Sequence, residues 1–278
     1  MQGIIGSGIG LRSEFIHEVI PSGFSPDWFE ITPENWIYMP YSYREAFAEI
    51  VSKFPIVCHG LSLSIGSPEK LNRKFLKDLK SFLDEHNLQY YSEHLSFSSF
   101  QGSQTYELLP LPMTKDMIDH VADRVKEVQD ILERPLILEN ATYYHVPYME
   151  MREVDFLNGV MEASGAKMLL DVNNIFVNAT NHNFDAKAFI NELNIDKAAY
   201  IHVAGHTLYE QENLIIDSHG TPVRTEVWNL LSYVLEKIDI PVMLERDNDV
   251  PELSILEKEY QTLKEIVLEA EKKRLIYA

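Results

Sequence analysis

The chain lacks the features that mark secreted and membrane-spanning proteins. Its 278 residues contain a single cysteine, Cys58, which excludes an internal disulfide framework and favours a reducing compartment. No apolar run approaches the roughly 20 residues that a helix needs to span a bilayer. The N-terminal residues do not show the basic region and apolar stretch of a signal peptide. We therefore expect a cytoplasmic protein that does not bind membranes.

Basic residues are scarce as well. The sequence has 24 Lys and Arg against 43 Asp and Glu, which gives a formal net charge of −19 at pH 7. Because proteins bind nucleic acid largely by neutralising phosphates with Lys and Arg, this balance argues against a nucleic-acid partner. Bound cations would neutralise part of the excess. The hydrophobic fraction of 45% supplies ample material for a core and excludes a disordered chain.

Strand and helix patterns alternate along the whole chain. Apolar runs typical of buried strands lie near 3–10, 27–31, 55–59, 88–94, 135–139, 167–172, 198–203 and 241–245. Helices are expected between them at 41–53, 69–86, 115–132, 150–164, 185–193, 222–237 and 252–272, with Asp185 beginning one helix and Gly165 ending another. Eight strands separated by helices are typical of a (β/α)8 TIM barrel of the α/β class, whereas an open doubly wound sheet usually has fewer strands. No linker or shift in composition interrupts the pattern, so we predict a single TIM-barrel domain over residues 1–278.

Seven of the short apolar runs end on an acid or a histidine. Their last residues are Glu30, His59, His94, Glu139, Asp171, His202 and Glu245. One such residue alone is usually a helix cap or a polar group that the backbone satisfies. The carboxyl ends of barrel strands, however, all face the site that the βα loops build. Several carboxylates on that rim would repel one another strongly without cations, so the joint pattern predicts a metal site.

The rim and its loops supply nine candidate metal ligands. These are His59, His94, Glu139, Asp171, Asn174, His202, Asp217, His219 and Glu245. Asp217 and His219 are two residues apart, so both can point the same way in extended chain. One ion takes roughly four to six ligands, and the set therefore suits two or three ions. Nitrogen and oxygen donors without a thiolate predict iron, manganese or zinc and exclude an iron–sulfur cluster.

Three further residues are predicted to have catalytic roles around the ligands. Glu30 ends the second strand, and its distance from the later strands favours a hydrogen bond to a ligand over metal binding. His206 follows His202 by four residues and could contact metal or substrate. Arg246 directly follows Glu245. Cys58 should point away from the barrel interior, because side chains alternate along a strand.

The order of these ligands is similar to the trinuclear site of endonuclease IV and the xylose-isomerase-like barrels, except that Asn174 stands where endonuclease IV has a histidine. A closer resemblance covers nearly the whole chain. The segments that carry it are His59–Gly66, Ser92–Phe97, Leu108–Pro112, Leu138–Asn140, Leu170–Asn174, Ile201–His206 and Leu244–Asp247. They resemble the DUF692 (UPF0276) family, also called multinuclear non-haem iron-dependent oxidases.

The resemblance implies two or three iron ions, as Fe2+ or Fe3+, and oxidation by O2 of cysteine residues in a ribosomally synthesised precursor peptide. It also implies a partner protein that captures the leader of this peptide. Transferred by position, one iron would be held by His59, His94 and Glu139. A second would be held by Glu139 as a bridge with Asp171, His202 and Glu245, and a third by Asn174, Asp217 and His219. An amide is a weaker donor than imidazole, so we expect the Asn174 site to be the loosest.

Two other functions remain open at this point. One is a zinc- or manganese-dependent phosphodiesterase of the endonuclease IV type, which the acidity of the chain and Asn174 disfavour. The other is a metal-binding accessory protein without turnover. Metal identity and oxygen uptake with a cysteine-containing peptide would separate these functions from the oxidase.

Overall fold

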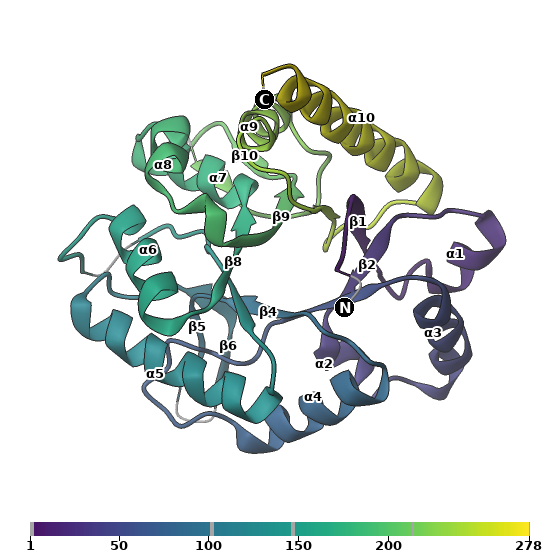
Figure 1. Ribbon diagram of the computed structural model, residues 1–278, viewed down its shortest axis with the longest axis horizontal. Coiled ribbons are helices and arrows are strands. Elements are labelled where there is room, and N and C mark those ends of the chain that lie inside the picture. Colours follow the sequence, from purple (N-terminus) through teal and green to yellow (C-terminus); the bar gives the residue numbers. More distant parts are fainter. Residues whose placement is uncertain (1–2, 101–102, 146–147, 213, 278) are drawn as a thin grey trace.

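The computed structural model describes residues 3–100, 103–145, 148–212 and 214–277 (Figure 1). Eight parallel strands close into a barrel in the order β1-β2-β3-β4-β7-β8-β9-β12 and back to β1. Their bounds are β1 Ser7–Gly10, β2 Trp28–Ile31, β3 Ile56–Gly60, β4 Tyr91–His94, β7 Leu136–Glu139, β8 Lys167–Asp171, β9 Ala198–Ala204 and β12 Val242–Glu245. Each strand coincides with one of the runs predicted from the sequence, with β3 and β9 ending one residue later than predicted, and the (β/α)8 barrel is confirmed.

Helices surround the barrel (Figure 1). They are α1 Ile16–Ser22, α2 Pro33–Trp36, α3 Tyr41–Lys53, α4 Arg73–Glu85, α5 Lys115–Leu132, α6 Glu153–Ser164, α7 Val172–His182, α8 Ala186–Glu192, α9 Thr225–Leu235 and α10 Leu253–Tyr277, with a short 3-10 helix at Ile195–Lys197. Asp185 caps α8 by accepting hydrogen bonds from two backbone N–H groups, and Gly165 ends α6 in the left-handed conformation, as predicted. Within the described part of the chain, no helix is both long and apolar enough to cross a bilayer.

Alternation along the strands divides the core into two regions. The barrel interior is filled by a cluster that includes Trp28, Val57, Ile137, Leu169, Tyr200 and Met243. Outward-facing residues such as Phe29, Cys58 and Leu138 belong to a larger cluster beneath the helices, so Cys58 points away from the interior as predicted. On β1 the side chain facing Trp28 is reduced to a hydrogen, because a Cβ on Gly8 would lie 2.5 Å from the indole ring.

The next inward position on six of these strands, two residues nearer the carboxyl end, carries a potential metal ligand. These residues are Glu30, His59, Glu139, Asp171, His202 and Glu245, each two positions after a member of the interior cluster. The apolar layer therefore forms a floor, and the polar residues lie together directly above it. This two-layer arrangement follows from the period of two in a strand.

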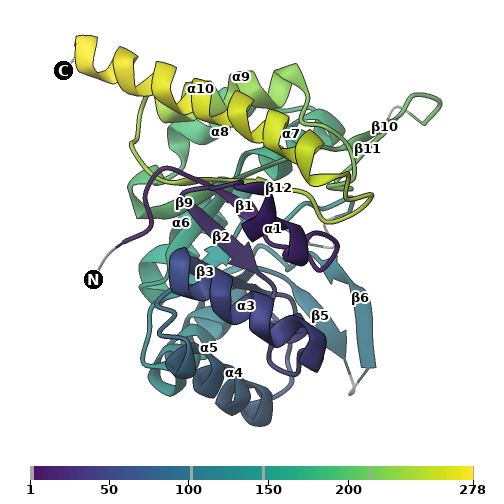
Figure 2. The same ribbon diagram turned by 90° about the vertical axis from the view of Figure 1, so that its right-hand side faces the viewer.

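Several elements of the fold were not predicted from the sequence. Helix α7 begins immediately after β8, although its sequence is rich in Asn and β-branched residues, which are poor helix formers. Two hairpins are also new: β5 (Phe97–Phe100) pairs with β6 (Ser103–Leu109), and β10 (Thr207–Tyr209) pairs with β11 (Leu214–Ile216). Figure 2 shows that both hairpins project on the same side of the molecule.

Candidate metal centre

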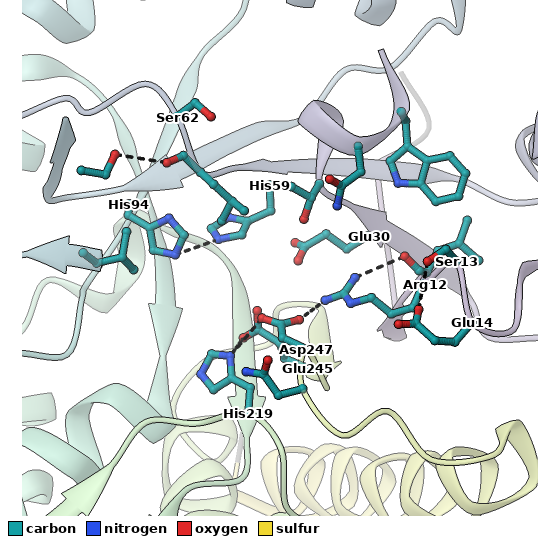
Figure 3. A pocket seen from close by; sticks show the side chains of 18 of the residues that line it. Arg12, Ser13, Glu14, Glu30, His59, Ser62, His94, His219, Glu245 and Asp247 are labelled. Atoms are coloured by element: carbon teal, nitrogen blue, oxygen red, sulfur yellow. Dashed lines mark hydrogen bonds and ion pairs between the residues drawn. The ribbon is translucent and has the colours of Figure 1, made fainter. Parts of the chain in front are cut away.

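The carboxyl ends of seven barrel strands bring imidazoles and carboxylates together at the base of one cleft, above the apolar floor, as predicted. Four overlapping groups have potential ligand atoms within 4.8 Å of one another: His59/His94/Glu139, Glu139/Asp171/His202, Asp171/His219/Glu245 and Glu30/His202/Glu245. The cleft has a volume of about 940 Å³. Figure 3 shows Glu30, His59, His94, His219 and Glu245 around this cleft. Glu139, Asp171, His202 and Glu245 each belong to two groups, so neighbouring groups share ligands as the sites of a metal cluster do.

Five buried polar atoms in these residues make no well-formed hydrogen bond among the described residues, and they lie against other potential ligand atoms, as His202 Nδ1 does 3.1 Å from Glu245 Oε2. They are Glu139 Oε2, Asp171 Oδ2, His202 Nδ1, His219 Nε2 and Glu245 Oε2. Buried polar atoms nearly always make hydrogen bonds, so five buried atoms without a well-formed hydrogen bond in one cluster of residues need an explanation. Each atom carries a lone pair when it is deprotonated, and the donor set of imidazole and carboxylate suits divalent metal ions. The residues present therefore fit a group of bound cations.

Each of the four histidines has its second ring nitrogen held by a neighbour on the side away from the cluster. His59 Nδ1 lies 2.8 Å from Ser92 Oγ, His94 Nδ1 lies 3.2 Å from the carbonyl oxygen of Gly60, His202 Nε2 lies 3.0 Å from Glu30 Oε2, and His219 Nδ1 lies 3.2 Å from Asp247 Oδ2. A carbonyl or carboxylate oxygen only accepts, so the contacts of His94, His202 and His219 place a ring proton on the outer nitrogen. The inner nitrogen of each ring then faces the cluster and would bind metal once it has lost its own proton, as in most metal-binding histidines.

The carboxylate of Asp171 is fixed in a similar way. Asp171 ends β8 and caps α7, because its Oδ1 accepts a hydrogen bond of 2.7 Å from the backbone N–H of Asn174. Asn140 also anchors Asp171, since its amide bonds both the backbone N–H and the backbone C=O of Asp171. Only Oδ2 of Asp171 is left to face the cluster. Capping thus aims one specific oxygen at the site.

Asn174 does not have the orientation of a ligand. Its Nδ2 donates to the carbonyl oxygen of Asn140 at 3.0 Å and approaches Glu139 Oε1 at 3.3 Å, while its Oδ1 accepts from Thr142. Turning the amide over would bring two carbonyl oxygens together, because the group on Asn140 can only accept. The structure therefore places the NH2 group of Asn174 against Glu139 and its oxygen on the far side. This differs from the prediction that Asn174 binds metal.

Burial and charge set how the centre holds protons before metals bind. Burial lowers the pKa of His59, but the charge of Glu139, the hydrogen bond to it and the charge of Glu30 together outweigh burial and raise this pKa from 6.5 to about 9. Burial lowers the pKa of His94 to about 4. Burial, with the charge of Glu139, raises the pKa of Asp171 well above its usual range. A cation that binds here must displace the protons of His59 and Asp171.

The remaining predicted residues take different places. Asp217 lies beside the centre, with Oδ1 2.6 Å from His219 Nε2. Glu30 lies against His202, as expected of a supporting residue. His206 stacks on Phe176 and bonds Asn173, and Arg246 pairs with Glu259 on α10; neither lines the cleft. A catalytic role for these last two residues is therefore not favoured by their contacts.

Four residues of the site were not identified from the sequence. Ser92 and Tyr200 lie beneath the ligands, and Arg12 and Asp247 form an ion pair beside His219. Ser92 could have been found by alternation, because it precedes His94 by two residues on β4 and must face the interior. The contact between Arg12 and Asp247 joins residues 235 positions apart, which no local pattern reveals.

The parallel (β/α)8 barrel has the fold of a TIM barrel, and solved proteins with a similar fold include one described as xylose isomerase-like. The model of one family, described as the RiPP precursor modification enzyme MbnB/TglH/ChrH, matches residues 6–268. The chain belongs to this family, whose members act on ribosomally synthesised and post-translationally modified peptides.

Curated relatives agree with this membership. A UPF0276 protein of Shewanella oneidensis is 46% identical over 88% of each chain, and one of Shewanella sediminis is 44% identical over 93% of each chain. A UPF0276 protein of Acinetobacter baylyi is 42% identical over 95% of this chain and 92% of the relative. The DUF692/UPF0276 resemblance read from the sequence is confirmed.

Solved structures support the fold alone. D-psicose 3-epimerase from Clostridium cellulolyticum H10 superimposes with a TM-score of 0.62 at 13% identity, covering 96% of this chain and 99% of the epimerase. A xylose isomerase-like TIM barrel protein from Mycobacterium smegmatis, solved with magnesium, gives a TM-score of 0.60 at 12% identity and covers 97% and 98% of the two chains.

Proposed function

We propose that the protein is a multinuclear non-haem iron-dependent oxidase that uses O2 to modify cysteine residues of a ribosomally synthesised precursor peptide. The observation that carries the proposal is the set of five buried ligand atoms that make no well-formed hydrogen bond and lie in overlapping groups, in a member of a precursor-modifying family. A partner protein that binds the leader of the peptide is part of the proposal. A cytoplasmic location would keep both the iron and the substrate thiol reduced.

The proposed ligands follow the groups of the centre. His59, His94 and Glu139 would hold one ion, and Glu139, Asp171 and His202 a second. Asp171, His219 and Glu245 would hold a third when three ions are bound. Iron suits these nitrogen and oxygen donors, as manganese and zinc also do. The chain's only cysteine, Cys58, is fully buried on the side of β3 that faces the helices, and it supplies no competing thiolate.

Bound iron would supply the Lewis acidity that activates a thiol and the electrons that reduce O2. The chain's own residues supply the place for the peptide. Trp36, Tyr43, Leu61 and Leu108 line the cleft and offer apolar contacts to a peptide segment. A volume of about 940 Å³ is large enough to admit several side chains above the centre.

The charge of the cleft argues against a phosphodiesterase. Its described lining contains six carboxylates, those of Glu14, Glu30, Glu107, Asp217, Glu245 and Asp247. Arg12 is the one Lys or Arg in this lining, and it is paired with Asp247. A nucleic-acid backbone needs cationic side chains, and this surface does not provide them.

The test begins with protein purified without oxygen. We expect elemental analysis to find two or three iron ions per chain. Oxygen uptake should then depend on a cysteine-containing peptide encoded beside the gene, with a mass change at the cysteine. The matched control is the same peptide with serine in place of that cysteine, which should support no uptake. Stoichiometric zinc with negligible iron, or iron-loaded protein that consumes no oxygen with any such peptide, would contradict the oxidase.

A further inference from the structure

A chain of hydrogen bonds runs beneath the proposed metal ligands and connects two of the histidines. His59 Nδ1 lies 2.8 Å from Ser92 Oγ, and Ser92 Oγ lies 2.6 Å from the hydroxyl of Tyr200. The Tyr200 hydroxyl lies 2.8 Å from Glu30 Oε2, which also lies 3.0 Å from His202 Nε2. All five residues are buried, with at most 4% of the surface of any of them exposed.

The direction of every bond in this chain follows from its one acceptor-only member. A Glu30 carboxylate cannot donate, so both the Tyr200 hydroxyl and His202 Nε2 must donate to it. The Tyr200 proton is then used, and the 2.6 Å contact requires Ser92 to donate to Tyr200. Ser92 has a single hydroxyl proton, which also lies toward the carbonyl oxygen of Cys58 (Oγ···O 3.3 Å) and is not free for the imidazole, so the contact with His59 requires Nδ1 to be the donor. All the protons point toward Glu30.

We propose that Glu30 is the common acceptor that orients two metal-binding histidines, His202 directly and His59 through Tyr200 and Ser92. The inference rests on the proposed metal-binding function and adds positioning residues that hold both imidazoles in the tautomer that metal binding requires. His202 presents Nδ1 to the cluster, and His59 presents Nε2, which lies 3.1 Å from Glu139 Oε2. The two rings come from strands on different sides of the barrel, yet one carboxylate sets both.

Packing alone does not explain this chain of hydrogen bonds. The layer below the ligands is apolar on the other strands, and Ser92 is a polar exception in it. Tyr200 already has an acceptor in Glu30, so Ser92 is not needed to satisfy it. Without Ser92, however, His59 Nδ1 would be left without its partner inside the barrel. The hydroxyl of Ser92 therefore serves the histidine.

The decisive variant is Tyr200→Phe, which removes one hydroxyl and keeps the ring that packs edge-on against Trp28. The matched control is Tyr91→Phe. Tyr91 is also fully buried and also bonds a buried carboxylate, Glu93, but it faces the helices and not the centre. Metal-free forms of each protein would be dialysed against graded concentrations of Fe2+ without oxygen, and the bound metal measured by elemental analysis.

We expect Tyr200→Phe to weaken one ion, at the His59 site, by roughly tenfold or more, since partners of metal-binding histidines typically contribute 10–100-fold. Tyr91→Phe should bind as the wild type does. Glu30→Gln should weaken two ions, because it serves both histidines. In a His94→Ala background, which lacks the first site, Tyr200→Phe should have no further effect.

Ser92→Ala breaks the same link at a different residue, and we expect it to weaken the same ion. It therefore provides the test if Tyr200→Phe does not fold. Equal Fe2+ affinity in Tyr200→Phe and wild type would overturn the inference, as would an equal loss at all sites with a matching fall in Tm. Wild-type protein that binds no metal would reject both this inference and the proposed function. Metal binding without oxidase activity would reject only the latter.

Discussion

Glu139 is the residue whose replacement tests the arrangement of the centre most directly. Its Oε2 lies 3.1 Å from His59 Nε2 and 3.3 Å from His94 Nε2, and its Oε1 lies 3.8 Å from His202 Nδ1. The two oxygens therefore face different groups of potential ligands, and one carboxylate can serve two ions. Glu139→Gln keeps the shape of the side chain and removes its charge, so the packing of the floor should be preserved.

The expected loss can be estimated from the charge alone. Two unit charges about 4 Å apart interact by ~4 kcal/mol at an effective dielectric constant of about 20. Since each 1.4 kcal/mol is a factor of ten, this corresponds to roughly a thousandfold in affinity for each ion that the carboxylate contacts, and this is a lower value because Fe2+ carries two charges. We expect Glu139→Gln to lose two iron equivalents under conditions where the wild type is saturated, as measured by elemental analysis of protein prepared without oxygen.

The matched control is Glu153→Gln. Glu153 is another buried carboxylate, but it lies on α6 and accepts hydrogen bonds from Tyr143 and Asn178, away from the cleft. This variant should keep all its iron. Loss of a single equivalent from Glu139→Gln would show that Glu139 is an ordinary ligand and reject the bridge, and loss of the same metal from the control would show a general effect of removing a buried charge.

Three further predictions follow from the same geometry. The pKa of His59 is raised from 6.5 to about 9, so this side chain holds its proton at neutral pH and loses it as the pH rises. Titration calorimetry should therefore show the affinity of the His59 site for Mn2+ rising about tenfold per pH unit up to about pH 9. An affinity that does not change over this range would be inconsistent with a protonated His59. Arg12→Gln should lower the Mn2+ affinity of the His219 group by roughly 10–100-fold in the same titration, because Arg12 holds Asp247 against His219. The control Arg134→Gln removes a similar pairing with a carboxylate and a backbone carbonyl far from the cleft, and it should leave this affinity unchanged. Removal of metal by a chelator should lower Tm by several degrees in calorimetry, since a ligand at a thousand times its Kd adds about 4 kcal/mol to stability; an unchanged Tm would mean that the site is not filled in the folded protein.

The fold and much of the centre could be predicted because both depend on local periodicity. Strand runs that end on Glu, Asp or His specify the inward side of each strand, and β/α alternation closes the barrel. Helix α7 was missed because its intrinsic propensity is low; the cap supplied by Asp171 and the burial of one face outweigh that propensity. The hairpins depend on loop conformation, which leaves a weaker pattern than a buried strand.

The details of the site were less accessible because they depend on contacts between distant residues. Asn174 has the spacing of a ligand, but the carbonyl of Asn140 turns its amide the other way. Glu30 and Tyr200 are 170 positions apart, and their hydrogen bond exists only after the barrel closes. A sequence pattern can therefore identify which strand ends share a rim, while the orientation of each donor atom is decided by tertiary contacts.

The separation of the barrel into two layers explains how a stable fold tolerates so many buried charges. The apolar floor, with Trp28, Leu169 and Met243 fully buried, provides stability without any contribution from the rim. The rim carries carboxylates that burial makes costly, and in the metal-free state Asp171 reduces that cost by holding a proton. Cations replace those protons without disturbing the floor, because Asp171 is already fixed by its cap and the histidines by the partners of their outer nitrogens. The centre is therefore preorganised, and the energy of metal binding need not be used to order it.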